Sequence, residues 1–240
     1  MLTIINRLIW HYRTFIRKYI VMDMDLKIED KSKNESKYLW LLDPGHGGMI
    51  DGEYQTAGKR SPKFKDGTVL YEGEFNRAVV QRIDSACNAA GIDSIVLVPE
   101  EEDISLKERV KRANDFYKVD KRAVYLSVHA NAFGNNWNQA HGWSCYTSKG
   151  ETRSDQIATI FYRMMAAEFP EEKMRKDHTD KDPDKEADFY VLKKTAMPAV
   201  LTENFFMTNS TEAAMLLNED IRDRIADAHM DAIYYLSKKS

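Results

Sequence analysis

Cysteine is scarce in this chain of 240 residues, which contains only Cys87 and Cys145. Two cysteines far apart in the sequence exclude a disulfide framework and a CxxC zinc site. Cys87 lies in a helical pattern beside alanines and Cys145 in an apolar strand pattern, so we expect both to pack in the core. Free thiols of this kind are compatible with a reducing compartment.

The sequence also lacks an excess of positive charge and a long apolar run. Lys and Arg total 35 against 38 Asp and Glu, a formal net charge of −3, so we expect no nucleic-acid partner. No stretch reaches the roughly 18 apolar residues that a membrane span needs. The motif HExxH is missing, which excludes a thermolysin-like zinc site.

The first 37 residues differ in composition from the rest. Residues 1–22 are basic and have apolar residues every three or four positions, which predicts an amphipathic helix. Arg7 and Arg13 interrupt the apolar run and no small-residue cleavage site follows, so the segment does not resemble a signal peptide. We expect this arm to contact a membrane surface or another protein, or simply to pack on the domain. Residues 25–37 are charged and are predicted to be a linker.

Strand and helix patterns alternate over residues 38–240, which we expect to form one folded domain. This alternation predicts a single α/β domain with a twisted, mostly parallel sheet and helices on both faces. A charged stretch, residues 173–186, is predicted to be a loop near the functional site of the domain. A helix is predicted to start at a Ser154 or Asp155 cap. The predicted strands are YLWLLD, IDSIVLV, AVYLSVHANA, HGWSCYTS, DFYVLK and PAVLTENFF.

Three of these strands run into ionisable residues. His46 follows WLLDPG, His129 follows YLSV, and Glu203 follows AVLT. Sites in open α/β sheets form beyond the carboxyl ends of the strands, so we expect the three side chains to converge on one rim. Two neutral imidazoles directed at one point are common ligands of zinc.

A catalytic zinc ion usually has three protein ligands, and the third is expected to be a carboxylate or another histidine. YEGEFNRAVV supplies Glu72 and Glu74 at the start of a helix, and the buried stripe of that helix favours Glu72, with Glu74 as the alternative. Glu203 could act as a general base toward water. Asp43 could accept a hydrogen bond from the His46 ring and fix its tautomer.

Six motifs in a fixed order resemble one known family, the zinc-dependent N-acetylmuramoyl-L-alanine amidases (amidase-3), which includes cell-wall hydrolases and phage endolysins. They cover about residues 38–238. The motifs are DPGHGG, EGEFNRAV, ISLKERVKRAN, SVHANA, HGWSCY, and PAVLTENFF with MTN after it.

The resemblance implies that His46, Glu72 and His129 bind Zn²⁺ and that Glu203 is the catalytic glutamate. It also implies the substrate, which is the amide between N-acetylmuramic acid and L-alanine in peptidoglycan. Synthesis in the cytoplasm with holin-type release to the wall is then the expected route. A zinc peptidase or deacylase and a non-catalytic wall-binding protein are the alternatives. Four residues are candidates for the substrate rim: Asn131, His141, His178 and Asn204.

Overall fold

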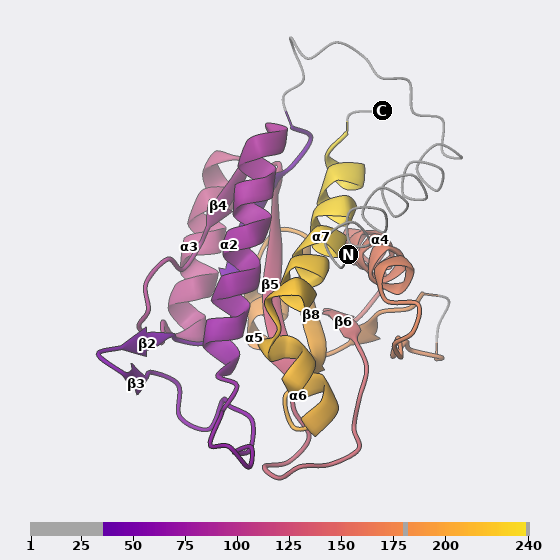
Figure 1. Cartoon of the computed structure of the whole chain (residues 1–240). Helices are drawn as coiled ribbons and strands as arrows, with labels where there is room; N and C mark the ends of the chain where they lie inside the picture. Colours follow the sequence, from indigo (N-terminus) through magenta and orange to yellow (C-terminus); the bar gives the residue numbers. More distant parts are fainter. Residues whose placement is uncertain (1–35, 180–181, 239–240) are drawn as a thin grey trace. The chain divides into compact units, whose positions relative to one another are not determined.

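The structure, a computed structural model, describes residues 36–179 and 182–238. The predicted amphipathic arm and nearly all of the predicted linker lie outside these residues, so the expected boundary at residues 37 and 38 stays a prediction. Among the described residues, the strands of the main sheet have the order β4-β1-β5-β8-β6-β7 (Figure 1). Their bounds are β1 Leu39–Pro44, β4 Ser94–Val96, β5 Ala123–Asn131, β6 Ser144–Thr147, β7 Lys185–Glu186 and β8 Ala199–Phe206.

Strand direction divides the sheet into a parallel part and a reversed edge. Strands β4, β1, β5 and β8 run parallel to one another, whereas β6 runs antiparallel to β8, and β7 runs parallel to β6. The predicted α/β fold with a mostly parallel sheet is therefore confirmed. A two-stranded hairpin, β2 (Met49–Ile50) and β3 (Glu53–Tyr54), was not predicted, because strands of two residues carry no periodic signal.

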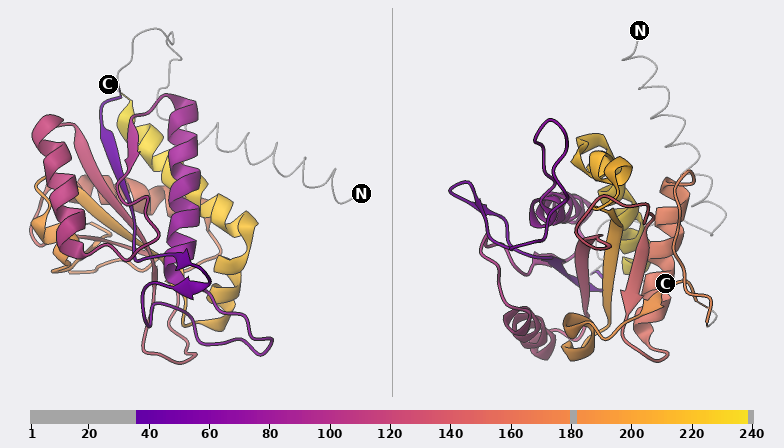
Figure 2. Two further views of the ribbon diagram at one scale, coloured as in Figure 1. Left: turned by 90° about the vertical axis from the view of Figure 1, so that its left-hand side faces the viewer. Right: turned by 90° about the horizontal axis from the view of Figure 1, so that it is seen from below.

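Helices cover both faces of the sheet, as predicted (Figure 2). In β1 the alternation of side chains places Trp40 and Leu42 in one hydrophobic cluster and Leu39 and Leu41 in the other. The first cluster is completed by α2 (Glu72–Ala90), α4 (Arg153–Glu168), α6 (Ser210–Leu217) and α7 (Glu219–Ser237). The second is completed by α3 (Leu106–Val119) and α5 (Tyr190–Lys194).

Three local predictions were wrong. The stretch DFYVLK is not a strand: its last four residues lie in the short helix α5. Val191 and Leu192 are both buried on one face of the sheet, which alternating strand geometry does not allow. The charged stretch 173–186 is not wholly a loop, since it contains β7. Helix α4 is capped by Thr152, and Asp155 is the third helical residue, which closes a capping box with it.

Both cysteines are buried and free, as predicted. No helix among residues 36–179 and 182–238 is long and apolar enough to cross a membrane. The parallel strands β1, β5 and β8 end on the same side of the sheet, where α2 begins, toward the lower end of Figure 1. This edge carries the candidate site.

Candidate metal centre

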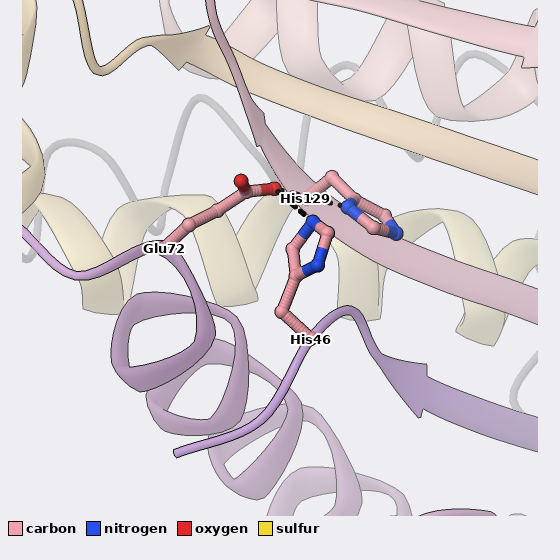
Figure 3. A group of neighbouring side chains, drawn as sticks. All are labelled: His46, Glu72 and His129. Atoms are coloured by element: carbon pink, nitrogen blue, oxygen red, sulfur yellow. Dashed lines mark hydrogen bonds and ion pairs between the residues drawn. The ribbon is translucent and has the colours of Figure 1, made fainter. Parts of the chain in front are cut away.

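His46, Glu72 and His129 meet at the carboxyl edge of the sheet (Figure 3). One oxygen of Glu72, Oε1, lies 3.2 Å from Nε2 of His46 and 3.0 Å from Nδ1 of His129. The two rings are nearly perpendicular, with centroids 5.0 Å apart. The residues come from the turn after β1, the first position of α2 and the end of β5, so the fold itself brings together three segments that are distant in the sequence.

The turn that carries His46 is held by close backbone approaches. His46 itself has the positive φ of 68°, while Gly45, Gly47 and Gly48 do not. These glycines are required for space instead: a Cβ at Gly45 would lie 2.1 Å from the His129 ring. Gly73 in the first turn of α2 is equally constrained, because its Cβ would lie 1.8 Å from the carbonyl oxygen of Gly47. Helix α2 and the β1 turn are therefore in direct contact beside the site.

The structure distinguishes the two glutamates of EGEFN. Glu72 is 2% exposed and contacts both imidazoles. Glu74 points elsewhere, toward Gly48, where a Cβ would lie 2.9 Å from its Oε1. Of the two alternatives left by the sequence, Glu72 is thus the one that lies in the histidine cluster.

Burial and mutual contact shift the pKa values in the cluster. Burial raises the pKa of Glu72, but hydrogen bonds and charge interactions with His129 and His46 outweigh it, so the pKa lies below its ordinary value. The pKa of His46 is lowered, mainly by burial, although Glu72 acts in the opposite direction. A neutral His46 and an anionic Glu72 are the protonation states that a metal ion needs from its ligands.

Glu203 occupies the neighbouring strand at the level of His129, because the two residues are register partners in β5 and β8. Its Oε2 is buried and has no hydrogen-bond partner among the described residues. Burial and the negative charge of Glu72 raise the pKa of Glu203 well above its ordinary value, while Lys59 lowers it. A carboxyl group in this position is suited to exchange a proton with a molecule bound beside it.

Asp43 was predicted to accept a hydrogen bond from the His46 ring, and this prediction was wrong. Asp43 makes no hydrogen bond to the His46 ring among the described residues; it binds Arg109, Tyr125 and Ser127. The reason is the direction of its side chain, which leaves β1 on the face where α3 packs. Ser127 Oγ in turn lies 3.2 Å from His129 Nε2, so Asp43 is connected to the other histidine.

Asn204 is also placed differently from the prediction. Its side chain is fully buried, donates to the backbone oxygen of His129 at 3.0 Å and accepts from the indole of Trp143 at 2.9 Å. It therefore belongs to the core behind the site and not to a substrate rim. Asn131 is half-buried at the end of β5, two residues beyond His129, and its rim role stays a prediction.

His141 and His178 lie on the surface. The His141 ring contacts the carbonyl oxygen of Gln139, and its own carbonyl accepts from Arg175 of the charged stretch. His178 is exposed, with its backbone N–H bound to Asp177. Neither ring contacts the histidine cluster within residues 36–179 and 182–238, and their contact with substrate stays a prediction.

Two arginines of the site were missed by the sequence interpretation. Arg77 and Arg109 are 6% and 2% exposed, and both donate to the carbonyl oxygen of His46, at 2.8 and 3.0 Å. The signal was present in ISLKERVKRAN, where Arg109 lies one helical turn before Ala113 on the buried stripe. A basic residue in such a position requires a buried partner.

The donor set fits a metal ion. Two imidazole nitrogens and a carboxylate oxygen lie within 4.8 Å of one another. The second oxygen of Glu72, Oε2, is buried without a hydrogen-bond partner among the described residues, and a cation bound by both carboxylate oxygens would satisfy it. Two histidines and one carboxylate are a common ligand set for catalytic zinc, which keeps a further position open.

Fold and site together define an α/β protein with a three-residue candidate metal-binding group at the carboxyl edge of its sheet. Comparison with known families agrees: residues 41–235 match the profile of the N-acetylmuramoyl-L-alanine amidases, Amidase_3. The chain belongs to this family, which confirms the resemblance seen in its motifs.

Individual relatives share the family but differ in length. The chain is 29% identical over 193 residues to N-acetylmuramoyl-L-alanine amidase LytC of Bacillus subtilis, a match that covers 80% of this chain and 34% of LytC. It is 30% identical over 213 residues to the endolysin of Bacillus phage SPP1, covering 85% of this chain and 69% of the endolysin. The chain thus spans about a third of LytC and about two thirds of the endolysin.

A solved structure shows the same architecture. The crystal structure of an N-acetylmuramoyl-L-alanine amidase from Clostridium difficile 630 superposes with a TM-score of 0.67 at 25% identity. The match covers 87% of this chain and 100% of that one. The predicted fold class is confirmed over the described residues.

Proposed function

We propose that this protein hydrolyses the amide between N-acetylmuramic acid and L-alanine in peptidoglycan. The observation that carries the proposal is the meeting of His46, Glu72 and His129 beside Glu203, in a chain that belongs to the amidase family. The name of LytC, an N-acetylmuramoyl-L-alanine amidase, supports the same substrate. Action at the cell wall follows from this substrate.

We infer that the site binds Zn²⁺ through Nε2 of His46, Oε1 of Glu72 and Nδ1 of His129, the atoms that face one another. A bound zinc ion supplies a Lewis acid, which polarises the scissile carbonyl and makes water more acidic. The chain contributes the arrangement of donors. Glu72 provides the single negative charge of the donor set, so a bound divalent ion would leave the site with net positive charge toward the substrate oxygen.

Glu203 is the proposed general base and acid. It accepts a proton from the attacking water and then donates that proton to the alanine nitrogen as the C–N bond breaks. Its unpartnered Oε2 supports this role, because no other described group competes for the proton. Its position opposite His129 in the sheet fixes the carboxylate beside the metal ligands.

The decisive experiment is digestion of purified peptidoglycan by the zinc-loaded protein, with mass spectrometry of the products and metal analysis of the protein. Free peptide stems with an L-alanine amino terminus, together with peptide-free glycan, are expected. Cleavage within the stems would instead favour a peptidase, and release of acyl groups a deacylase. Binding to peptidoglycan without cleavage would favour a wall-binding protein and contradict the proposal.

A further inference from the structure

A buried ion pair lies behind the candidate metal centre. The side chains of Asp43 and Arg109 are 1% and 2% exposed and are in direct contact. The loss of hydration of two buried charges largely offsets their attraction, so a buried ion pair is weak evidence for a role in stability alone. The other hydrogen bonds of Asp43 and Arg109 connect this ion pair to His129 and to His46.

Asp43 is connected to the ring of His129 through one serine. Ser127 Oγ lies 2.8 Å from Asp43 Oδ2 and 3.2 Å from His129 Nε2. The carboxylate can only accept, so the serine hydroxyl donates to Asp43 and its lone pairs face the ring. The ring must then carry its proton on Nε2. A metal ion bound beside Glu72 would then take the lone pair of Nδ1, the nitrogen that faces the Glu72 carboxylate at 3.0 Å and can otherwise donate to it.

Arg109 is connected to His46 through the backbone. Its guanidinium donates to the carbonyl oxygens of Pro44, at 2.7 Å, and of His46, at 3.0 Å. Arg77 donates to the same His46 oxygen at 2.8 Å. His46 has a φ of 68°, a conformation that is unfavourable for a residue with a side chain. Two cationic donors on one carbonyl hold this turn in place.

We propose that Asp43, Arg109 and Ser127 act as one positioning unit, which fixes the tautomer of His129 and the backbone of His46 and thereby sets the affinity of the site for zinc. The inference rests on the proposed function, because it assumes that these histidines bind the metal. None of the three residues is placed to touch substrate. Groups that orient metal-bound histidines typically change metal affinity about 10- to 100-fold when they are removed.

The test uses Ser127→Ala in the full chain, because this change breaks the link to His129 and leaves the ion pair intact. The dissociation constant for Zn²⁺, measured by competition with a chelator, is expected to rise about 10- to 100-fold. The absorption spectrum of the Co²⁺-substituted protein is expected to change as the ring reorients. Ser127→Thr, which retains the hydroxyl, should restore most of the affinity.

Ser154→Ala is the matched control. Ser154 is also buried, and its hydroxyl accepts from the N–H of Ala199 at the amino end of β8, away from the site. We expect both serine-to-alanine variants to lose thermal stability. Only Ser154→Ala should keep the zinc affinity of the wild type. Arg109→Lys retains the charge but cannot reach both carbonyls, so it should weaken zinc binding as well.

Equal zinc affinity and equal Co²⁺ spectra for Ser127→Ala and the wild type would overturn the inference. A wild-type protein that binds zinc but leaves peptidoglycan intact would overturn the proposed function only, since the comparison of zinc affinities would still decide this inference. A wild-type protein that does not bind zinc would overturn both.

Discussion

Gly45 lies directly against the imidazole of His129. A Cβ at this glycine would come within 2.1 to 2.5 Å of three ring atoms, far inside any van der Waals contact. The backbone cannot easily retreat, because the Gly45 N–H donates to the carbonyl oxygen of Val128 at 3.1 Å. The ring is itself held between Glu72 and Ser127. The glycine therefore constrains the position of His129, a proposed metal ligand 84 residues away, counted from the two residue numbers.

Gly45→Ala is expected to displace the His129 ring and to weaken zinc binding by at least about 10-fold, a loss comparable with that of an orienting group. Overpacking of this kind also destabilises a core, typically by about 1–3 kcal/mol. Chelator competition measures the first effect, and thermal unfolding of the metal-free protein measures the second.

Gly91→Ala separates the two effects of the preceding change. Gly91 caps α2 with a φ of 66° and has open space around it, so alanine there adds backbone strain without a clash. We expect this variant to lose stability and to retain zinc affinity. If both glycine variants bound zinc as the wild type does, the close approach to His129 would have no bearing on the metal.

Glu72→Gln and Glu74→Gln form a matched pair two positions apart in one helical turn. Loss of the Glu72 charge removes the only anionic donor of the cluster, so zinc affinity should fall by more than the roughly 100-fold expected for an orienting residue. Glu74 is directed toward Gly48, and its variant should bind zinc normally. Metal analysis after dialysis checks both, and the reverse result would assign the ligand to Glu74.

The mostly parallel sheet could be predicted from the sequence because apolar runs alternate with helical patterns, and three of these runs end in His46, His129 and Glu203. The rule that such strands end at one edge then brings these residues together. The choice of Glu72 over Glu74 rested on helical register, and the structure gives the same choice. In these cases a local pattern and a general rule were sufficient.

The partners of Asp43 and Asn204 could not be predicted in the same way. Both residues stand beside site histidines in the sequence or in the sheet, yet Asp43 binds Arg109, 66 positions away, and Asn204 binds Trp143, 61 positions away. Such pairings depend on which face of a strand a side chain leaves and on what packs against that face. The helix α5 was missed for a related reason, since tertiary burial of Val191 and Leu192 outweighed their strand propensity.

Glu203→Gln is expected to abolish most hydrolysis while it leaves zinc bound. Glutamine has nearly the same shape but cannot accept and return a proton, and loss of a general acid or base typically costs about 100- to 10,000-fold in rate. Product release from peptidoglycan measures the turnover, and metal analysis confirms that zinc is retained. Normal turnover by a zinc-loaded variant would remove Glu203 from the mechanism.

A second carboxylate group, away from the histidines, predicts a pH effect on stability. Oxygens of Asp155, Asp182 and Asp184 lie within 4.8 Å of one another, and Asp184 is 1% exposed. Burial, with the nearby charges of Asp182 and Asp155, raises the pKa of Asp184 to about 7, although a hydrogen bond from Thr147 acts in the opposite direction. The ordinary pKa of the unfolded residue is 3.8.

Asp184→Asn should therefore stabilise the protein more at high pH than at low pH. Between pH 4 and pH 7 the unfolded wild type releases this proton and the folded protein retains it, so rising pH favours unfolding over that window and has no further effect above it. Asparagine does not ionise, so the variant's melting temperature minus that of the wild type should be several degrees larger at pH 8 than at pH 5. Thermal unfolding with EDTA throughout measures the difference.

Asp188→Asn is the control. Lys149 and Lys193 lower the pKa of the exposed Asp188, so the melting temperature of this variant should not rise relative to the wild type at pH 8. If the melting temperature of Asp184→Asn minus that of the wild type were the same at pH 5 and at pH 8, the Asp184 carboxyl would ionise normally in the folded protein.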